Sequence, residues 1–172
     1  MSPEAKSGAR GVDLVVAYLE EHGVAHHVID HERTFSAMAE AKAAEVPPDH
    51  AAKSVLLREG EAYRLAVIPA SERLDLRRAR AALQASGQLR LANESEMAAD
   101  FGSFDVGAIP PLGPMLPAPE VIDPRLLVHD RILCSGGDHR HSLLIDPKEL
   151  STLADARVAD VCKEESAREG LI

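Results

Sequence analysis

The sequence predicts a single α+β domain in which several helices flank a mixed β-sheet. Apolar runs of strand length alternate along the chain with segments whose apolar residues recur at helical spacing. The 172 residues suffice for one domain with its own core, and the 45% hydrophobic content argues against a disordered chain. We therefore expect one domain over residues 11–160, between a disordered tail at 1–10 and a charged tail at 161–172.

The first predicted elements are a helix, a strand and a second helix. Four apolar residues at helical spacing predict a helix over 12–21, and Gly23 supplies its stop signal. Residues 24–29 then have the composition of a strand. Thr34 or Ser36 is expected to cap an alanine-rich helix that runs to about residue 44 and ends before two prolines.

The middle of the chain contains a predicted hairpin and two capped helices. Residues 54–57 and 63–68 are apolar runs separated by Glu59-Gly60-Glu61, which is a hairpin signal. Asp75 is expected to cap a helix that ends near residue 84. Asn93 caps a shorter helix, and Glu96 stands where a capping box requires it.

The last third of the chain is expected to contain four strands and one helix. A strand over 105–109 leads into a long Pro/Gly loop that ends near residue 119. Further strands are predicted over 120–122, 131–134 and 142–145. A final helix begins after Asp146-Pro147 and runs to about residue 153.

Composition narrows the classes of function. Aromatic residues make up only 3% of the chain, which weakens a model of nucleic-acid binding by base stacking. The formal net charge of -9 gives no general attraction to phosphate, and we interpret it mainly as a contribution to solubility. The two cysteines have no metal-ligand spacing and form no disulfide framework. A polar N-terminus and the lack of a membrane-length apolar stretch predict a cytoplasmic protein without a membrane partner.

A lysine at the start of an apolar strand is the first candidate site residue. Lys53 lies within Ala51-Ala52-Lys53-Ser54-Val55-Leu56-Leu57, where an unpaired ammonium would be costly to bury. The functional interpretation is a cation that faces a cleft and holds a phosphate or polarises a carbonyl. The alternative is an edge-strand lysine that prevents aggregation or extends into water.

A rigid loop about fifty residues later is the second candidate. In Gly107-Ala108-Ile109-Pro110-Pro111 the prolines fix the backbone, and Gly107 allows a ligand to approach it closely. The amides of Gly107, Ala108 and Ile109 are then candidate donors to a ligand oxygen, as in an oxyanion hole. An ordinary turn is the alternative interpretation.

The histidines and the predicted hairpin over 135–142 give no metal site. A Gly-Gly hairpin with Asp138 and His139 near its tip invites a metal interpretation, but three supported ligands are not visible. A polar hairpin tip beside a pocket is the preferred interpretation. Because no Ser-His-Asp arrangement or cysteine nucleophile motif stands out, a hydrolytic pocket would use water without an evident protein base.

Several of these segments, taken in order, resemble the YbaK/EbsC-type aminoacyl-tRNA deacylases, which are relatives of the prolyl-tRNA synthetase editing domain. The opening helix is followed by His-Gly-Val and a strand. The other segments are Arg33-Thr34-Phe35-Ser36 before an alanine-rich helix, Ala52-Lys53-Ser54-Val55-Leu56, the family's GxxxP loop at Gly107–Pro111, and Cys134-Ser135-Gly136-Gly137 before Ser142-Leu143-Leu144-Ile145. They span residues 12–153. The proline-rich segment 110–124 and the hairpin 138–141 are not part of this pattern.

The resemblance implies a partly barrel-like mixed sheet and metal-free, cofactor-free hydrolysis of the ester between a wrong amino acid and its tRNA. Lys53 would anchor the phosphate backbone at the tRNA 3′ end, and the Gly107 amide would hold the scissile carbonyl or the terminal ribose. A hydroxyl of the terminal adenosine would help to activate water. The remaining expected substrate-binding residues are Phe35, Met38, Ser54, Ala108, Ile109, Pro111, Ser135, Gly136, Asp138 and His139.

Three functions follow as alternatives. The first is a freestanding trans-editing hydrolase, with tRNA-Pro carrying a small residue such as Ala or Cys as its expected substrate. The second is a module that binds a nucleotide or aminoacyl-tRNA without turnover. The third is an adaptor that docks on prolyl-tRNA synthetase or another synthetase through its acidic surface. Lys53 together with the intact loop favours the first, and the oligomeric state is left open.

Overall fold

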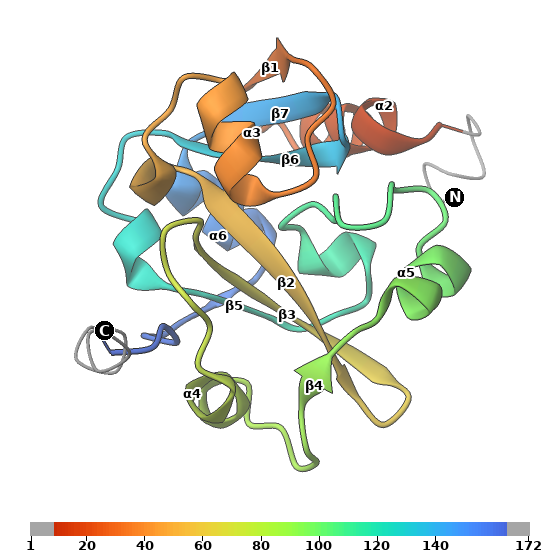
Figure 1. Cartoon of the computed structure of the whole chain (residues 1–172), viewed down its shortest axis with the longest axis vertical. Coiled ribbons are helices and arrows are strands. Elements are labelled where there is room, and N and C mark those ends of the chain that lie inside the picture. The colour runs from red at the N-terminus through yellow and green to blue at the C-terminus, as the bar shows by residue number, and fades with distance from the viewer. Residues whose placement is uncertain (1–8, 165–172) are drawn as a thin grey trace.

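The computed structural model describes residues 9–164 and has the predicted α+β fold (Figure 1). The α-helices in this part are α2 (Gly11–Glu21), α3 (Ala37–Ala43), α4 (Leu76–Ala82), α5 (Glu94–Asp100) and α6 (Pro147–Leu153). The 3-10 helices are η1 (Pro48–His50), η2 (Gly113–Met115) and η3 (Pro124–Leu126). The strands are β1 (His26–Asp30), β2 (Ala52–Glu59), β3 (Ala62–Pro69), β4 (Arg90–Leu91), β5 (Glu120–Ile122), β6 (Ile132–Asp138), β7 (His141–Ile145) and β8 (Arg157–Val158).

The strands form two sheets. A three-stranded sheet has the order β1-β7-β6 and is antiparallel throughout, whereas a five-stranded sheet has the order β4-β2-β3-β5-β8. In the larger sheet β5 pairs in parallel with β3 and β8, and the other pairs are antiparallel. A parallel bridge between Ala51 and Leu133 links the start of β2 to β6. This bridge joins the sheets without closing them into a barrel.

The aliphatic core is divided by the five-stranded sheet. Leu56 and Leu65 belong to the main cluster, which also contains Leu14 of α2 and Ile132 of β6. The neighbouring residues along β2 and β3 point to the other face, where Leu57, Ala66 and Ile68 pack against Ala79 of α4. This alternation is the ordinary consequence of strand geometry. A third cluster packs α3 against β6.

The predicted helix starts are confirmed where a side chain caps the backbone. The choice between Thr34 and Ser36 is settled, since the Ser36 hydroxyl accepts from the Ala39 amide at 3.1 Å. Asn93 and Glu96 form the expected capping box at α5. Asp75 and Asp146 cap α4 and α6. Each of these signals is local, because donor and acceptor are separated by only two or three residues.

Two expectations from the sequence need correction. Residues 105–109 form a tight turn rather than a strand, because Gly107 adopts φ +86° and the Ala108 amide bonds the Asp105 carbonyl. The packed structure also continues past residue 160, since Val161 and Cys162 are fully buried. The tails predicted at 1–10 and 161–172 otherwise lie mainly outside the described residues. Both cysteines are buried free thiols. No helix in the described part is both long and apolar enough to cross a membrane.

Candidate active site

A cavity of about 60 Å³ lies where α3, β2, the 105–111 turn and the β6–β7 hairpin meet. Its wall is made from segments that are far apart in the sequence. The lining residues are Thr34, Phe35, Ser36, Ala37, Glu40, Ala52, Lys53, Ser54, Gly107, Ala108, Ile109, Ser135, Asp138 and His139. The strand and the proline-stiffened turn singled out from the sequence therefore do border one cavity.

Nine of the twelve predicted site residues line this cavity. The three that do not are Met38, Pro111 and Gly136. Met38 lies in α3 with half of its surface exposed, and Pro111 is buried beyond the turn. Gly136 is buried in β6, where an added Cβ would lie 2.9 Å from the His141 carbonyl oxygen. Gly136 is therefore required for close strand packing rather than for contact with a ligand.

The turn at Gly107 presents main-chain donors to the cavity. Within the described residues, the N–H groups of Gly107 and Ile109 have no hydrogen-bond partner, although Ile109 is only 4% exposed. The Ala108 N–H differs from the expectation, because it closes the turn onto the Asp105 carbonyl at 2.9 Å. Buried N–H groups are normally paired, so the unpaired amide of buried Ile109 is a candidate donor to a ligand oxygen, and the amide of exposed Gly107 lies beside it in the same turn.

Ser135 holds this turn in position. Its hydroxyl donates to the Ala108 carbonyl at 2.9 Å and accepts from the Gly137 amide at 3.2 Å. The Asp105 carboxylate accepts from the His139 amide at 3.2 Å, and the Asp105 amide donates to the Gly137 carbonyl. Because these bonds join the turn to the β6–β7 hairpin, both sides of the cavity are held by the same hydrogen-bond network.

The side chain of Lys53 is directed away from the face of β2 that Ser54 occupies. Lys53 pairs with Ile68 across the sheet, so its side chain shares the face on which Ile68 and Leu57 pack against α4. Its ammonium donates to the Glu72 carbonyl at 2.9 Å. Half-burial lowers the pKa of Lys53, and nearby Arg73 adds to this effect while the Glu72 carboxylate opposes it. The β2 edge at Lys53 is not covered by β4, which pairs only with Leu57 and Arg58.

Ser54 is the polar side chain of β2 that faces the cavity. It follows Lys53 in the strand and lies on the face of Ala52 and Leu56, which belong to the main core cluster. Within the described residues its hydroxyl makes no hydrogen bond. It is therefore available to a ligand.

Asp138 and His139 form the outer part of the cavity beside Phe35. The Phe35 and His139 rings lie 4.9 Å apart, and Phe35 is 70% exposed, which places these rings at the opening. The Asp138 carboxylate accepts from the Arg140 amide, the His141 ring and the Val12 amide. Burial alone would raise the pKa of Asp138, but these hydrogen bonds have the larger combined effect, so the pKa of Asp138 is lowered. Asp138 thus serves mainly to fix the hairpin to α2.

The cavity wall also contains a buried acid that the sequence does not indicate. Glu40 of α3 is 8% exposed, and its carboxylate accepts a short hydrogen bond from the Ser142 hydroxyl. The His31 ring lies 2.7 Å from the same hydroxyl. Burial raises the pKa of Glu40, partly opposed by Ser142 and His31. The one signal in the sequence for a buried Glu40 is its position on the inner face of an alanine-rich helix.

Comparisons with known proteins agree with this arrangement. The aminoacyl-tRNA editing domain family matches residues 31–153, which is more than half of the chain and includes every residue that lines the cavity. The fold and the site thus define an editing domain, and the chain belongs to the aminoacyl-tRNA editing domain family. The predicted family resemblance is confirmed.

Solved structures extend the similarity over most of the domain. One described as a proposed trans-editing enzyme for prolyl tRNA synthetase is 29% identical, with a TM-score of 0.78 over 89% of this chain and 97% of that chain. A hypothetical protein is 25% identical, with a TM-score of 0.77 over 87% of this chain and 99% of that one. A structure from a study of computational epitope grafting onto scaffold proteins is 27% identical, with a TM-score of 0.77 over 89% and 97%. No curated protein sequence matches the chain significantly.

Proposed function

We propose that the protein is a freestanding hydrolase that removes wrongly attached amino acids from tRNA, with tRNA-Pro carrying a small residue such as Ala or Cys as its substrate. The observation that carries this proposal is that the amides of Gly107 and Ile109, in the wall of a cavity that Ser54 also lines, have no hydrogen-bond partner within residues 9–164. The family supports an editing role. The expected setting is the cytoplasm, with a synthetase as a partner in substrate delivery.

The reaction is the hydrolysis of an ester. Water attacks the carbonyl carbon, the bond from that carbon to the ribose oxygen breaks, and the ribose oxygen takes up a proton as the free amino acid leaves. Donors held in place before reaction stabilise the charge that develops on the carbonyl oxygen. The Gly107 and Ile109 amides are suited to this, because Ser135 fixes the turn that carries them. A hydroxyl of the terminal adenosine is proposed to help activate the water, so positioning accounts for much of the rate.

Lys53 is proposed to hold phosphate near the tRNA 3′ end. For this its ammonium must exchange the Glu72 carbonyl for a phosphate oxygen. The exchange is chemically reasonable, because a half-buried ammonium gains more from an anion than from a neutral carbonyl. Lys53 is therefore a substrate-positioning cation in this proposal, not a proton donor or acceptor.

The cavity size supports a small amino acid. A volume of about 60 Å³ accommodates a few water-sized groups, since one water needs on the order of 10–15 Å³ by this measure. A side chain such as that of Ala or Cys is compatible with this space. Exclusion by size discriminates strongly only when the difference exceeds one methylene, which is worth about 1–3 kcal/mol.

The test is deacylation of tRNAs that carry Ala, Cys, Ser or Thr. We expect turnover of at least one small-residue substrate, a loss of turnover in Lys53→Ala and Gly107→Ala, and no change in Lys148→Ala, an exposed lysine outside the cavity. Absence of turnover on every substrate, with nucleotide binding retained, would instead support a non-catalytic binding module. Equal turnover in Lys53→Ala and the wild type would remove the role given to that lysine.

A further inference from the structure

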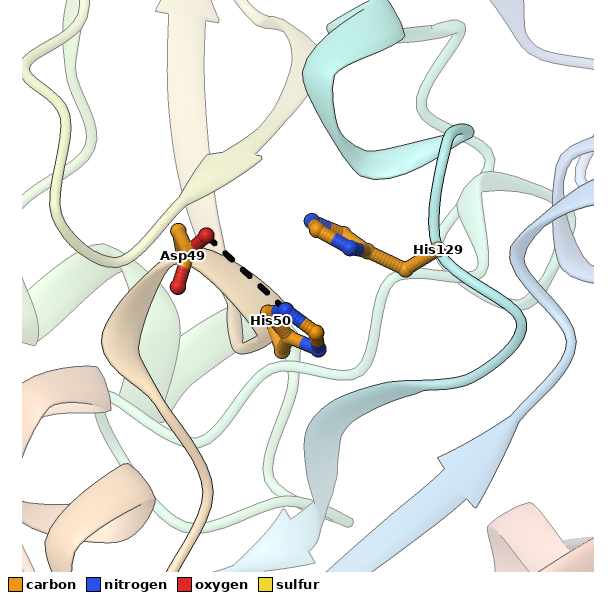
Figure 2. A group of neighbouring side chains, drawn as sticks. All are labelled: Asp49, His50 and His129. Carbon is orange, nitrogen blue, oxygen red and sulfur yellow. Dashed lines mark ion pairs between the residues drawn. The ribbon is translucent and has the colours of Figure 1, made fainter.

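A second group of polar side chains lies outside the cavity lining. Asp49 and His50 belong to η1, directly before β2, and His129 follows η3, shortly before β6. Figure 2 shows the carboxylate and the two rings turned toward one another from two different segments of the chain. We call these three residues the 49/50/129 cluster.

The donor atoms of the 49/50/129 cluster lie near one another. The two imidazole rings stack with their centroids 3.7 Å apart, and a carboxylate oxygen of Asp49 lies 3.9 Å from Nε2 of His50. One ligand atom from each residue lies within 4.8 Å of the other two. In a tetrahedral site with bonds of about 2.0–2.1 Å, ligand atoms are about 3.3 Å apart. The three donor atoms are therefore within reach of one ion, provided that the two rings rotate out of their stack, because an imidazole nitrogen binds a metal in the plane of its ring.

The donor atoms of the two histidines are available. Four other histidines, His22, His26, His31 and His141, use ring nitrogens in hydrogen bonds to carbonyl or side-chain oxygens. Within residues 9–164, neither His50 nor His129 makes a hydrogen bond through its ring. All three members of the cluster are at least partly accessible, so an ion has an open path from solvent.

The chemistry of the donors identifies the class of ion. Magnesium and calcium prefer sites made of oxygen ligands. Two imidazole nitrogens and one carboxylate oxygen suit a borderline divalent transition ion, with Zn²⁺ as the commonest case. We propose that the 49/50/129 cluster binds one Zn²⁺ ion, with water completing its coordination.

Such an ion would join two segments that bear on the cavity. His50 is three residues before Lys53 in β2, and His129 is six residues before Ser135 in β6. The segments already meet, because η1 and η3 are in contact and Ala51 bridges to Leu133. Zn²⁺ would therefore stabilise the junction between the two sheets, and this role does not depend on the proposed deacylation.

The experiment measures Zn²⁺ and Co²⁺ binding by the tag-free full chain after treatment with a chelator. We expect one equivalent of Co²⁺ to give visible d–d absorption that Zn²⁺ abolishes. Zn²⁺ at a hundred times its dissociation constant should raise the melting temperature by about 5–10 °C. His129→Ala and Asp49→Asn should each weaken binding at least about tenfold, since even outer-shell changes cost that much.

The control is His27→Ala, which removes an exposed histidine of β1 outside the cluster and should bind as the wild type does. A histidine-ring NMR spectrum of the wild type provides a readout that needs no variant, since only the His50 and His129 signals should move with Zn²⁺. The Zn²⁺ site is contradicted if metal binding never saturates, or if the affinity is unchanged in both His129→Ala and Asp49→Asn. It is also contradicted if ring signals of histidines other than His50 and His129 move with Zn²⁺.

Discussion

Glu120 allows the most quantitative prediction for this protein. It is 2% exposed at the start of β5, where one carboxylate oxygen accepts from the Gly113 amide at 2.8 Å. The other oxygen has no hydrogen-bond partner among the described residues. Burial raises the pKa of Glu120 from 4.5 to about 8, and the Gly113 hydrogen bond opposes this only in part.

The raised pKa of Glu120 determines how the stability of the fold changes with pH. Because the folded-state pKa is raised, the folded state retains a proton that the unfolded state loses above pH 4.5. Below pH 4.5, Glu120 therefore leaves the free energy of unfolding unchanged. As the pH rises from 4.5 toward 8, this free energy falls. A change from 4.5 to about 8 corresponds to about 5 kcal/mol, at about 1.4 kcal/mol for each pKa unit.

Glu120→Gln should remove most of this loss while keeping an acceptor for the Gly113 amide. We expect the variant to exceed the wild type in unfolding free energy by about 3 kcal/mol at pH 8 and by less than about 1 kcal/mol at pH 5. For a chain of this size that is a rise of about 6–12 °C in melting temperature at pH 8. Urea denaturation at both pH values is the assay. Glu61→Gln, in the exposed β2–β3 turn, is the control.

A raised pKa for Glu120 is contradicted if the difference in stability between the variant and the wild type is the same at pH 5 and pH 8, or if the variant is less stable at pH 8. Either result would mean that the carboxyl is solvated or paired in solution. The control variant should show no difference between the two pH values, because its side chain is exposed in the folded protein.

The remaining predictions concern the cavity wall. Gly107→Ala should still fold, because an added Cβ meets only His139 Cε1 at 3.8 Å. Its φ of +86° should nevertheless cost about 1–2 kcal/mol, and deacylation should fall well beyond what this loss explains. Ser135→Ala should cost about 1 kcal/mol and speed hydrogen exchange at the Ala108 amide; unchanged exchange would contradict its positioning role. Glu40→Ala should be less stable than Glu40→Gln by about 1–3 kcal/mol in urea, because it leaves the Ser142 hydroxyl without its acceptor.

Much of the fold could be predicted from the sequence because its signals are local. The capping box at Asn93 and Glu96 and the turn at Gly60 each depend on residues within one turn of chain. The turn at Asp105–Ile109 differs from the predicted strand, because its apolar residues match a strand pattern while the positive φ of Gly107 ends any extended run. The short strands β4 and β8 were not foreseen, because two-residue pairings are decided by tertiary contacts.

The sequence predicts which segments border the cavity, but it does not predict the hydrogen bonds that orient their polar groups. The order of the segments around Lys53 and Gly107 was enough to expect a common pocket. The Lys53 ammonium is directed by its hydrogen bond to the Glu72 carbonyl. The Ala108 amide is not available to a ligand because it donates to the Asp105 carbonyl. Neither contact leaves a periodic signal in the sequence. Glu40 was missed because an acid in a short helix is usually solvent-exposed.

An NMR titration can show whether the Gly107 and Ile109 amides bind the acyl group of a substrate. The ligand is an adenosine that carries alanine through a stable amide in place of the ester, so that it mimics the aminoacylated tRNA end without being hydrolysed. We expect saturable shifts of the Gly107 and Ile109 amide signals, with those of Ser54 and Ser135 following at the same ligand concentrations. If the ligand binds while both loop amides stay unchanged, the cavity is not the place where the acyl group is held.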